Sequence, residues 1–156
     1  MPEKETLERA ARDRRAGKSS STQAGEFVRE EMHHIREGKH GARSTKQAIA
    51  IGLSKARRAG VDLEPPEKGK TSEATRRKAK RDVEVGARGR KAVSTTRSRA
   101  TKKALKREGA GAASRSSLAR QARSAARKRS ASDRSAAAKK AARTRRAHAG
   151  TRRRAG

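Results

Sequence analysis

Lysine and arginine are the residues of this chain whose chemistry is most evident, because the side chain of each can bind a phosphate group. The sequence has 45 Lys and Arg against 16 Asp and Glu, a formal charge of +29. Residues 1–66 hold 14 basic and 10 acidic residues, whereas residues 67–156 hold 31 and 6. A net positive charge of this size favours binding to a polyanion. Each phosphate contact releases condensed counterions, so such binding depends on salt and not on base identity.

The candidate contacts with nucleic acid form basic clusters along the chain. The first surrounds the start of a predicted helix, where backbone N–H groups and the helix dipole favour phosphate. Recognition helices use the same positions to reach base edges, but helix capping alone explains Ser44, so phosphate contact is the main expectation. The full candidate set is Arg43, Ser44, Thr45, Lys46, Lys55, Arg57, Arg58, Arg76, Arg77, Lys78, Lys80, Arg81, Lys102, Lys103, Lys106, Arg107, Arg127, Lys128, Arg129, Lys139, Lys140, Arg143, Arg145, Arg146, Arg152, Arg153 and Arg154.

The near absence of aromatic residues indicates which nucleic acid the chain binds. Phe27 is the only aromatic residue, since the sequence has no Trp and no Tyr. Proteins that bind single strands, or that recognise RNA sequences, generally stack bases on aromatic rings. Duplex DNA is therefore the expected partner, and structured RNA is the alternative that stays open.

Three histidines, His33, His34 and His40, form a cluster of potential metal ligands. Adjacent residues of a helix point in different directions, and no Asp or Cys nearby in the sequence completes a zinc site. We interpret them as surface histidines and predict no metal; a weak metal or pH effect is the alternative. The sequence contains no P-loop and no G-x-S-x-G motif, so neither an enzyme nor a cofactor is expected.

Three predicted helices, at residues 3–16, 23–37 and 44–58, must position the N-terminal candidates. The last two are amphipathic and form a helical hairpin that resembles a helix-turn-helix. Ser44 and Gln47 have the spacing of a capping box. The predicted core consists of Phe27, Val28, Met32, Ile35, Ile49 and Leu53, with Leu7 or Val61 and Leu63 covering one end.

The predicted fold is all-α, with a small helical domain at residues 1–66 and a basic tail at residues 67–156. A core of this size contributes roughly 3–5 kcal/mol, so pairing of two copies through the N-terminal helices would supplement it. Residues 71–85 have the pattern of a further helix. Because few large aliphatic residues follow, we expect the tail to be largely disordered when free and helical on a polyanion.

The composition also bears on location. The sequence has no cysteine and no apolar run of the length that crosses a bilayer or forms a secretory signal. The tail lacks the bulky apolar face that a membrane-surface helix needs. We therefore expect a cytoplasmic protein located at the nucleoid, with no membrane partner.

The string GEFVREEMHHIREGKHGARSTKQAIAIGLSKARRAG at residues 25–60 resembles a family of small basic bacterial proteins of uncharacterised function. Its members carry nearly the same KHGARSTKQAIAIGLSKARRAG block, and some are labelled DNA-binding or plasmid-stabilising. The tail resembles the Lys/Ala/Arg-rich tails of linker histones and bacterial histone-like proteins. That resemblance implies a role for the tail alone, since the chain lacks the histone-like fold with β-arms.

The expected function is non-sequence-specific DNA binding by a nucleoid-associated, histone-like protein that neutralises phosphate charge. Two alternatives stay open. One is an RNA-binding or ribosome-associated basic protein. The other is a protein-interaction adaptor of the partitioning or antitoxin type, for which the tail is a basic anchor.

Overall fold

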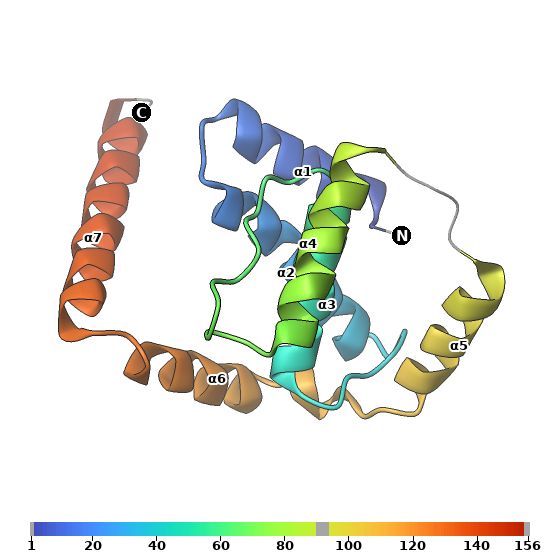
Figure 1. Cartoon of the computed structure of the whole chain (residues 1–156). Coiled ribbons are helices and arrows are strands. Elements are labelled where there is room, and N and C mark those ends of the chain that lie inside the picture. The colour runs from blue at the N-terminus through green and yellow to red at the C-terminus, as the bar shows by residue number, and fades with distance from the viewer. Residues whose placement is uncertain (1, 90–93, 155–156) are drawn as a thin grey trace. The chain divides into compact units, whose positions relative to one another are not determined.

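The computed structural model describes the backbone of residues 2–89 and 94–154, and the side chains of residues 2–89 and 94–146. Every regular element in these ranges is a helix, which confirms the all-α prediction for the described residues (Figure 1). The helices are α1 (Lys4–Arg15), α2 (Ser20–Arg36), α3 (Thr45–Arg58), α4 (Glu73–Ala87), α5 (Thr95–Lys106), the 3-10 helix η1 (Ala110–Ala113), α6 (Arg115–Arg127) and α7 (Ala131–Arg154).

The ends of α2 and α3 follow from residues that the sequence singled out. Oγ of Ser44 accepts a hydrogen bond of 3.2 Å from the backbone N–H of Gln47, so the predicted cap is confirmed. Oε1 of Gln47 accepts from the backbone N–H of Arg43 at 2.9 Å. Gly38 and Gly60 follow the two helices with φ of 71° and 87°, in the left-handed region that favours glycine.

The apolar core consists of two clusters, one between α2, α3 and η1 and the other between α1, α2, α3 and the segment after α3. All the residues predicted for the core lie in these clusters, which confirms that prediction. One cluster contains Met32 and Ile35 with Val28 and Ile49 packed against them. The other contains Phe27, with Leu7, Leu53, Val61 and Leu63 packed against it. The sequence interpretation did not include Ala112 and Ala113 of η1, which are buried in the first cluster.

Gly52 allows α3 to lie directly against α2. A Cβ atom at this position would lie 2.7 Å from Cα and 3.0 Å from N of Val28, and both of these are backbone atoms. Because a backbone cannot move aside as a side chain can, any larger residue must push the two helices apart.

Gly52→Ala is therefore expected to lower the free energy of unfolding by about 1–3 kcal/mol, the usual cost of overpacking. Urea denaturation followed by circular dichroism measures this loss. The matched control is Gly25→Ala on α2, where a Cβ atom meets nothing within 4 Å. That variant should instead gain about 0.5–1 kcal/mol, because alanine favours a helix over glycine. Equal effects of the two substitutions would contradict the close approach.

The predicted disorder of residues 67–156 is corrected, because most of the described part of this segment is helical. The helix expected at residues 71–85 is confirmed as α4, which packs on α3. Ala79 is buried at this contact, and Oγ of Ser54 donates to Oδ2 of Asp82 at 2.7 Å. Farther along, the N–H groups of Gly41 and Ala42 donate to the carbonyls of Leu105 and Gly109. Small residues and backbone hydrogen bonds make these contacts, so a search for large aliphatic residues did not find them.

The chain divides into two compact units, residues 1–118 and residues 119–156. The first contains α1 to α5 and η1, and the second contains most of α6 and all of α7. The division predicted at residues 66 and 67 follows the change in charge and stays a prediction. Among the residues described, no helix combines the length and the apolar character that a membrane span requires.

Candidate nucleic-acid interface

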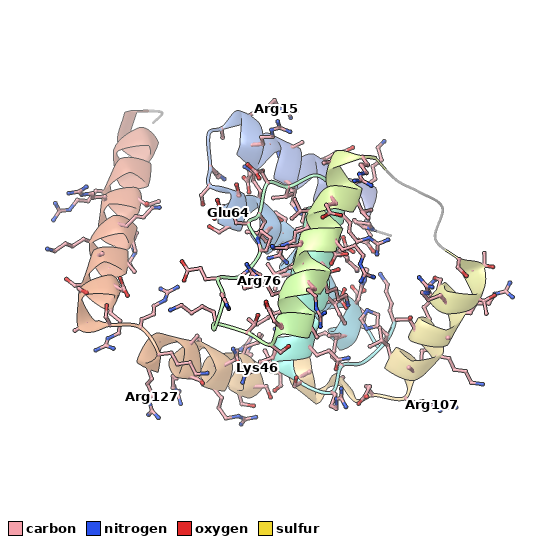
Figure 2. The ribbon with its side chains drawn as sticks, viewed as in Figure 1. Arg15, Lys46, Glu64, Arg76, Arg107 and Arg127 are labelled. Carbon is pink, nitrogen blue, oxygen red and sulfur yellow. The ribbon has the colours of Figure 1, made fainter. Side chains whose placement is uncertain are left out.

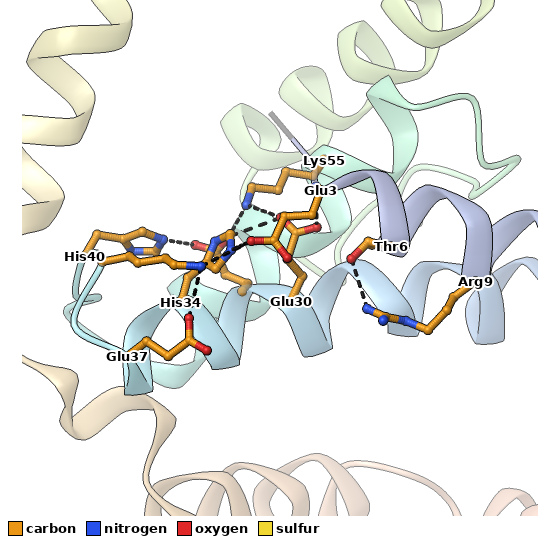
Figure 3. A network of polar contacts seen from close by, with 10 residues as sticks. Glu3, Thr6, Arg9, Glu30, His34, Glu37, His40 and Lys55 are labelled. Atoms are coloured by element: carbon orange, nitrogen blue, oxygen red, sulfur yellow. Dashed lines mark hydrogen bonds and ion pairs between the residues drawn. The ribbon is translucent and has the colours of Figure 1, made fainter.

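Lys55 of α3 is held by two buried carboxylates of α2 (Figure 3). Its Nζ lies 2.7 Å from Oε2 of Glu31 and 3.1 Å from Oε1 of Glu30. The side chains of these glutamates are 0% and 1% exposed. Burial alone would lower the pKa of Lys55, but the hydrogen bonds and charges of Glu31 and Glu30 hold this pKa above its ordinary value. The charge of Lys55 is therefore neutralised inside the protein.

Arg57 and Thr45 also make internal contacts. Arg57 is 8% exposed, and its Nε and Nη2 donate to the backbone carbonyls of Leu63 and Glu64, both at 3.1 Å. Burial holds the pKa of Arg57 below its ordinary value. Oγ1 of Thr45 donates to the carbonyl of Ala112 at 2.6 Å.

The phosphate contacts predicted for Lys55, Arg57 and Thr45 would compete with these internal contacts, and they stay predictions. Each is held by partners within the fold, so a phosphate would have to displace them. Ser44 caps α3 with its hydroxyl. Of the first cluster, Arg43, Lys46 and Arg58 have exposed side chains.

The later helices present a different picture, because their basic side chains face solvent (Figure 2). Arg76 of α4 is half-buried and donates to Oε1 of Glu73 at 3.0 Å. Arg152, Arg153 and Arg154 lie beyond the residues whose side chains are described. The remaining candidates of these helices are all exposed: Arg77, Lys78, Lys80, Arg81, Lys102, Lys103, Lys106, Arg107, Arg127, Lys128, Arg129, Lys139, Lys140, Arg143, Arg145 and Arg146.

Helical spacing brings some of these candidates into rows. Lys102 and Lys106 are four residues apart in α5 and share one side of that helix. Lys139, Arg143 and Arg146 are spaced by four and three residues in α7 and likewise form one row. Such rows hold several cations at one surface, as contact with a run of phosphates requires.

The second unit is the most one-sided part of the chain in charge. Residues 119–156 contain 14 Lys and Arg and a single acidic residue, Asp133. Asp133 lies in the first turn of α7, where a carboxylate complements the helix dipole. None of the residues of α6 is buried. The acidic residues of this unit therefore balance only one of its 14 positive charges.

The three histidines differ in their exposure to solvent. His33 is exposed, as predicted for a surface histidine. The side chains of His34 and His40 are only 12% and 17% exposed, and their rings meet edge to face with centroids 6.0 Å apart. Nε2 of His40 lies 3.3 Å from Oε1 of Glu31. The search for Asp and Cys missed this glutamate, although it precedes His34 by three residues in a predicted helix and so shares its face.

Comparison with known proteins gives one match. Residues 15–68 match the model of a family of unknown function (DUF6496). The match covers 54 of the 156 residues and includes α2 and α3. No curated protein and no solved structure matches the chain.

Proposed function

We propose that this protein binds nucleic acid without sequence preference, with duplex DNA as its main partner, by neutralising phosphates with the exposed cations of α4 to α7. The observation that carries the proposal is the second unit, with 14 basic residues against one acidic residue. In the first unit, Lys55 is paired with two carboxylates of the same fold. The second unit contains only one carboxylate side chain, that of Asp133.

The proposed mechanism is counterion release along the phosphate backbone. Residues 67–156 contain 20 Arg and 11 Lys. Arginine has a planar guanidinium that forms paired hydrogen bonds with phosphate oxygens, so it suits such contacts better than a point charge. The rows on α5 and α7 provide cations at a regular spacing without selecting a base.

The proposal favours duplex over single-stranded nucleic acid because Phe27 is unavailable for stacking. Its side chain is 0% exposed and belongs to the apolar core. Proteins that bind single strands stack successive bases on exposed aromatic rings. We extend the proposal to compaction of DNA at the nucleoid, because α5 and α7 each carry a row of cations and two such rows suit the bridging of duplexes.

A salt titration of the full chain with random-sequence duplex DNA tests the proposal. If about ten phosphates are engaged, the logarithm of the binding constant should fall with the logarithm of KCl concentration with a slope of about −9. Fluorescence anisotropy of a labelled duplex measures the constant. Affinity that does not change with KCl would overturn the proposal. Displacement of the labelled duplex by an equal amount of structured RNA would assign the same contacts to RNA.

A further inference from the structure

Glu31, His34 and His40 form a cluster with the donor chemistry of a metal site. Each offers one ligand atom, and these atoms lie within 4.8 Å of one another. Two imidazole nitrogens and one carboxylate oxygen are a ligand set that zinc accepts, with a fourth position left for water. Calcium and magnesium prefer sets composed of oxygen. We propose that this Glu31–His34–His40 cluster binds one zinc ion.

The distance between two of the ligand atoms fits this ion. Ligands about 2.0–2.1 Å from a zinc ion at the corners of a tetrahedron lie about 3.3 Å apart. Oε1 of Glu31 and Nε2 of His40 are 3.3 Å apart. The carboxylate is fully buried, and among the described side chains its only close cation is the ammonium of Lys55. Oε2 has the ammonium of Lys55 at 2.7 Å, which leaves Oε1 for the ion.

Each histidine of the cluster has one ring nitrogen held by an acceptor, and Nδ1 of His34 lies 4.0 Å from Oε1 of Glu30. Nδ1 of His40 donates to the carbonyl of Gly41 at 3.1 Å, and Nε2 of His34 donates to Oε1 of Glu3 at 2.8 Å. Such hydrogen bonds fix the tautomer and leave the second nitrogen as a lone pair. For His40 that second nitrogen is Nε2, the atom that faces Glu31.

The surroundings of the cluster have the charge to receive a divalent cation (Figure 3). The ion pairs around it join four carboxylates and two ammonium groups, a net charge of −2 when the imidazoles are neutral and Arg9, which pairs with Glu5 and Glu26, is left out. Its charged members are Glu3, Glu30, Glu31, Glu37, Lys39 and Lys55. A zinc ion would balance this charge in a chain that is otherwise strongly basic.

The ion would fasten the loop after α2 to α2 itself, because His40 lies in that loop while Glu31 and His34 lie on the helix. A structural metal is a common supplement to a small core. The full chain should therefore bind one equivalent of zinc and melt at a higher temperature with zinc than with a chelator. Magnesium at the same concentration should leave the melting temperature unchanged.

Calorimetric titration with ZnCl₂ tests the proposal on the wild type and on three variants. His34→Gln and His40→Gln should each weaken zinc binding at least tenfold and abolish the thermal shift. The matched control is His33→Gln, which replaces the exposed neighbour and should bind as the wild type does. Absence of zinc binding overturns the proposal, and so does equal binding by the His40→Gln and His33→Gln variants, because the ion would then be held elsewhere.

A second measurement needs no substitution and so does not depend on the folding of a variant. The imidazole nitrogen signals of the ¹⁵N-labelled wild-type chain report coordination directly. One equivalent of zinc should shift the signals of His34 and His40 and should leave those of His33 in place, with the signals assigned by through-bond experiments on the wild type. Shifts confined to other histidines would overturn the proposal.

Discussion

Replacing Lys55 by methionine should lower the free energy of unfolding by about 3–5 kcal/mol, the cost of leaving a buried charge without its partner. The substitution keeps an apolar stem of similar length but removes the ammonium that lies 2.7 Å from Glu31 and 3.1 Å from Glu30. Because proteins are stable by only about 5–15 kcal/mol, a loss of this size should remove a large part of the stability of the first unit. Circular dichroism and urea denaturation of the full chain measure the loss.

The control for Lys55→Met is Lys46→Met on the same helix, where the side chain is exposed. This variant has the same change in charge and should stay within about 0.5 kcal/mol of the wild type. A similar loss in both variants would mean that the net charge of α3, and not the buried pairing, determines stability.

The pH dependence separates loss of charge from loss of packing in Lys55→Met. Burial alone would raise the pKa of Glu30, but the hydrogen bonds from the Glu3 N–H and from Lys55 hold this pKa below its ordinary value. In the wild type the resulting stability is present above the unfolded pKa of about 4.3 and is lost as the pH falls through the lower folded pKa.

Without Lys55, burial prevails and the pKa of Glu30 should rise, so protonation removes the unpaired charge. The difference in unfolding free energy between the wild type and Lys55→Met should therefore narrow as the pH falls from 7 toward 4. A difference that is the same at both pH values would show that the variant loses packing of the lysine stem and not a charge partner.

The N-terminal helices could be predicted from the sequence because large apolar residues mark their buried faces. Phe27, Met32 and Ile35 recur at helical spacing on α2, and Ser44 and Gly60 mark the limits of α3. Burial of large apolar side chains contributes most of the stability of such helices, so the spacing of these residues in the sequence indicates which face is buried. The large apolar residues of this core were accordingly predicted, and the boundaries of the first three helices were predicted to within three residues.

The packing of the later segments could not be predicted in the same way. Ala79, Ala112 and Ala113 are buried, but alanine is as common on exposed helical faces as on buried ones and gives no contrast in the pattern. Gly86 lies so close to the carbonyl of Arg57 that a Cβ atom would meet it at 2.1 Å. Where two backbones approach this closely, the glycine is the only feature of the sequence that indicates the contact.

The candidate site was likewise predictable only in part. Exposure of the basic residues on α5 and α7 followed from composition, since no apolar stripe competes for those faces. The internal roles of Lys55 and Arg57 did not, because they depend on Glu31 and on the carbonyls of Leu63 and Glu64. Which cations are neutralised within the fold is a matter of tertiary contacts, and counting charges along the chain does not record it.

Neutralising the cations of α7 should weaken DNA binding far more than neutralising an equal number in the N-terminal helices. The α7 variant replaces Lys139, Lys140, Arg143, Arg145 and Arg146 by glutamine. If each contacts one phosphate, the salt slope should fall by about 4.5, since each contact contributes about 0.9. At 0.15 M salt the same relation weakens binding about 10³- to 10⁴-fold.

The matched N-terminal variant replaces Lys4, Arg12, Arg14, Arg15 and Arg29 by glutamine, all of which have exposed side chains. Each variant loses five of the 29 net positive charges, so the two differ only in where the charge is removed. Lys4 and Arg29 have glutamate partners in their own helices, and the slope should change by less than half as much as in the α7 variant. Equal salt slopes for the two variants would mean that binding depends on the total charge of the chain. The cations of α4 to α7 would then contribute no more to DNA binding than those of the N-terminal helices.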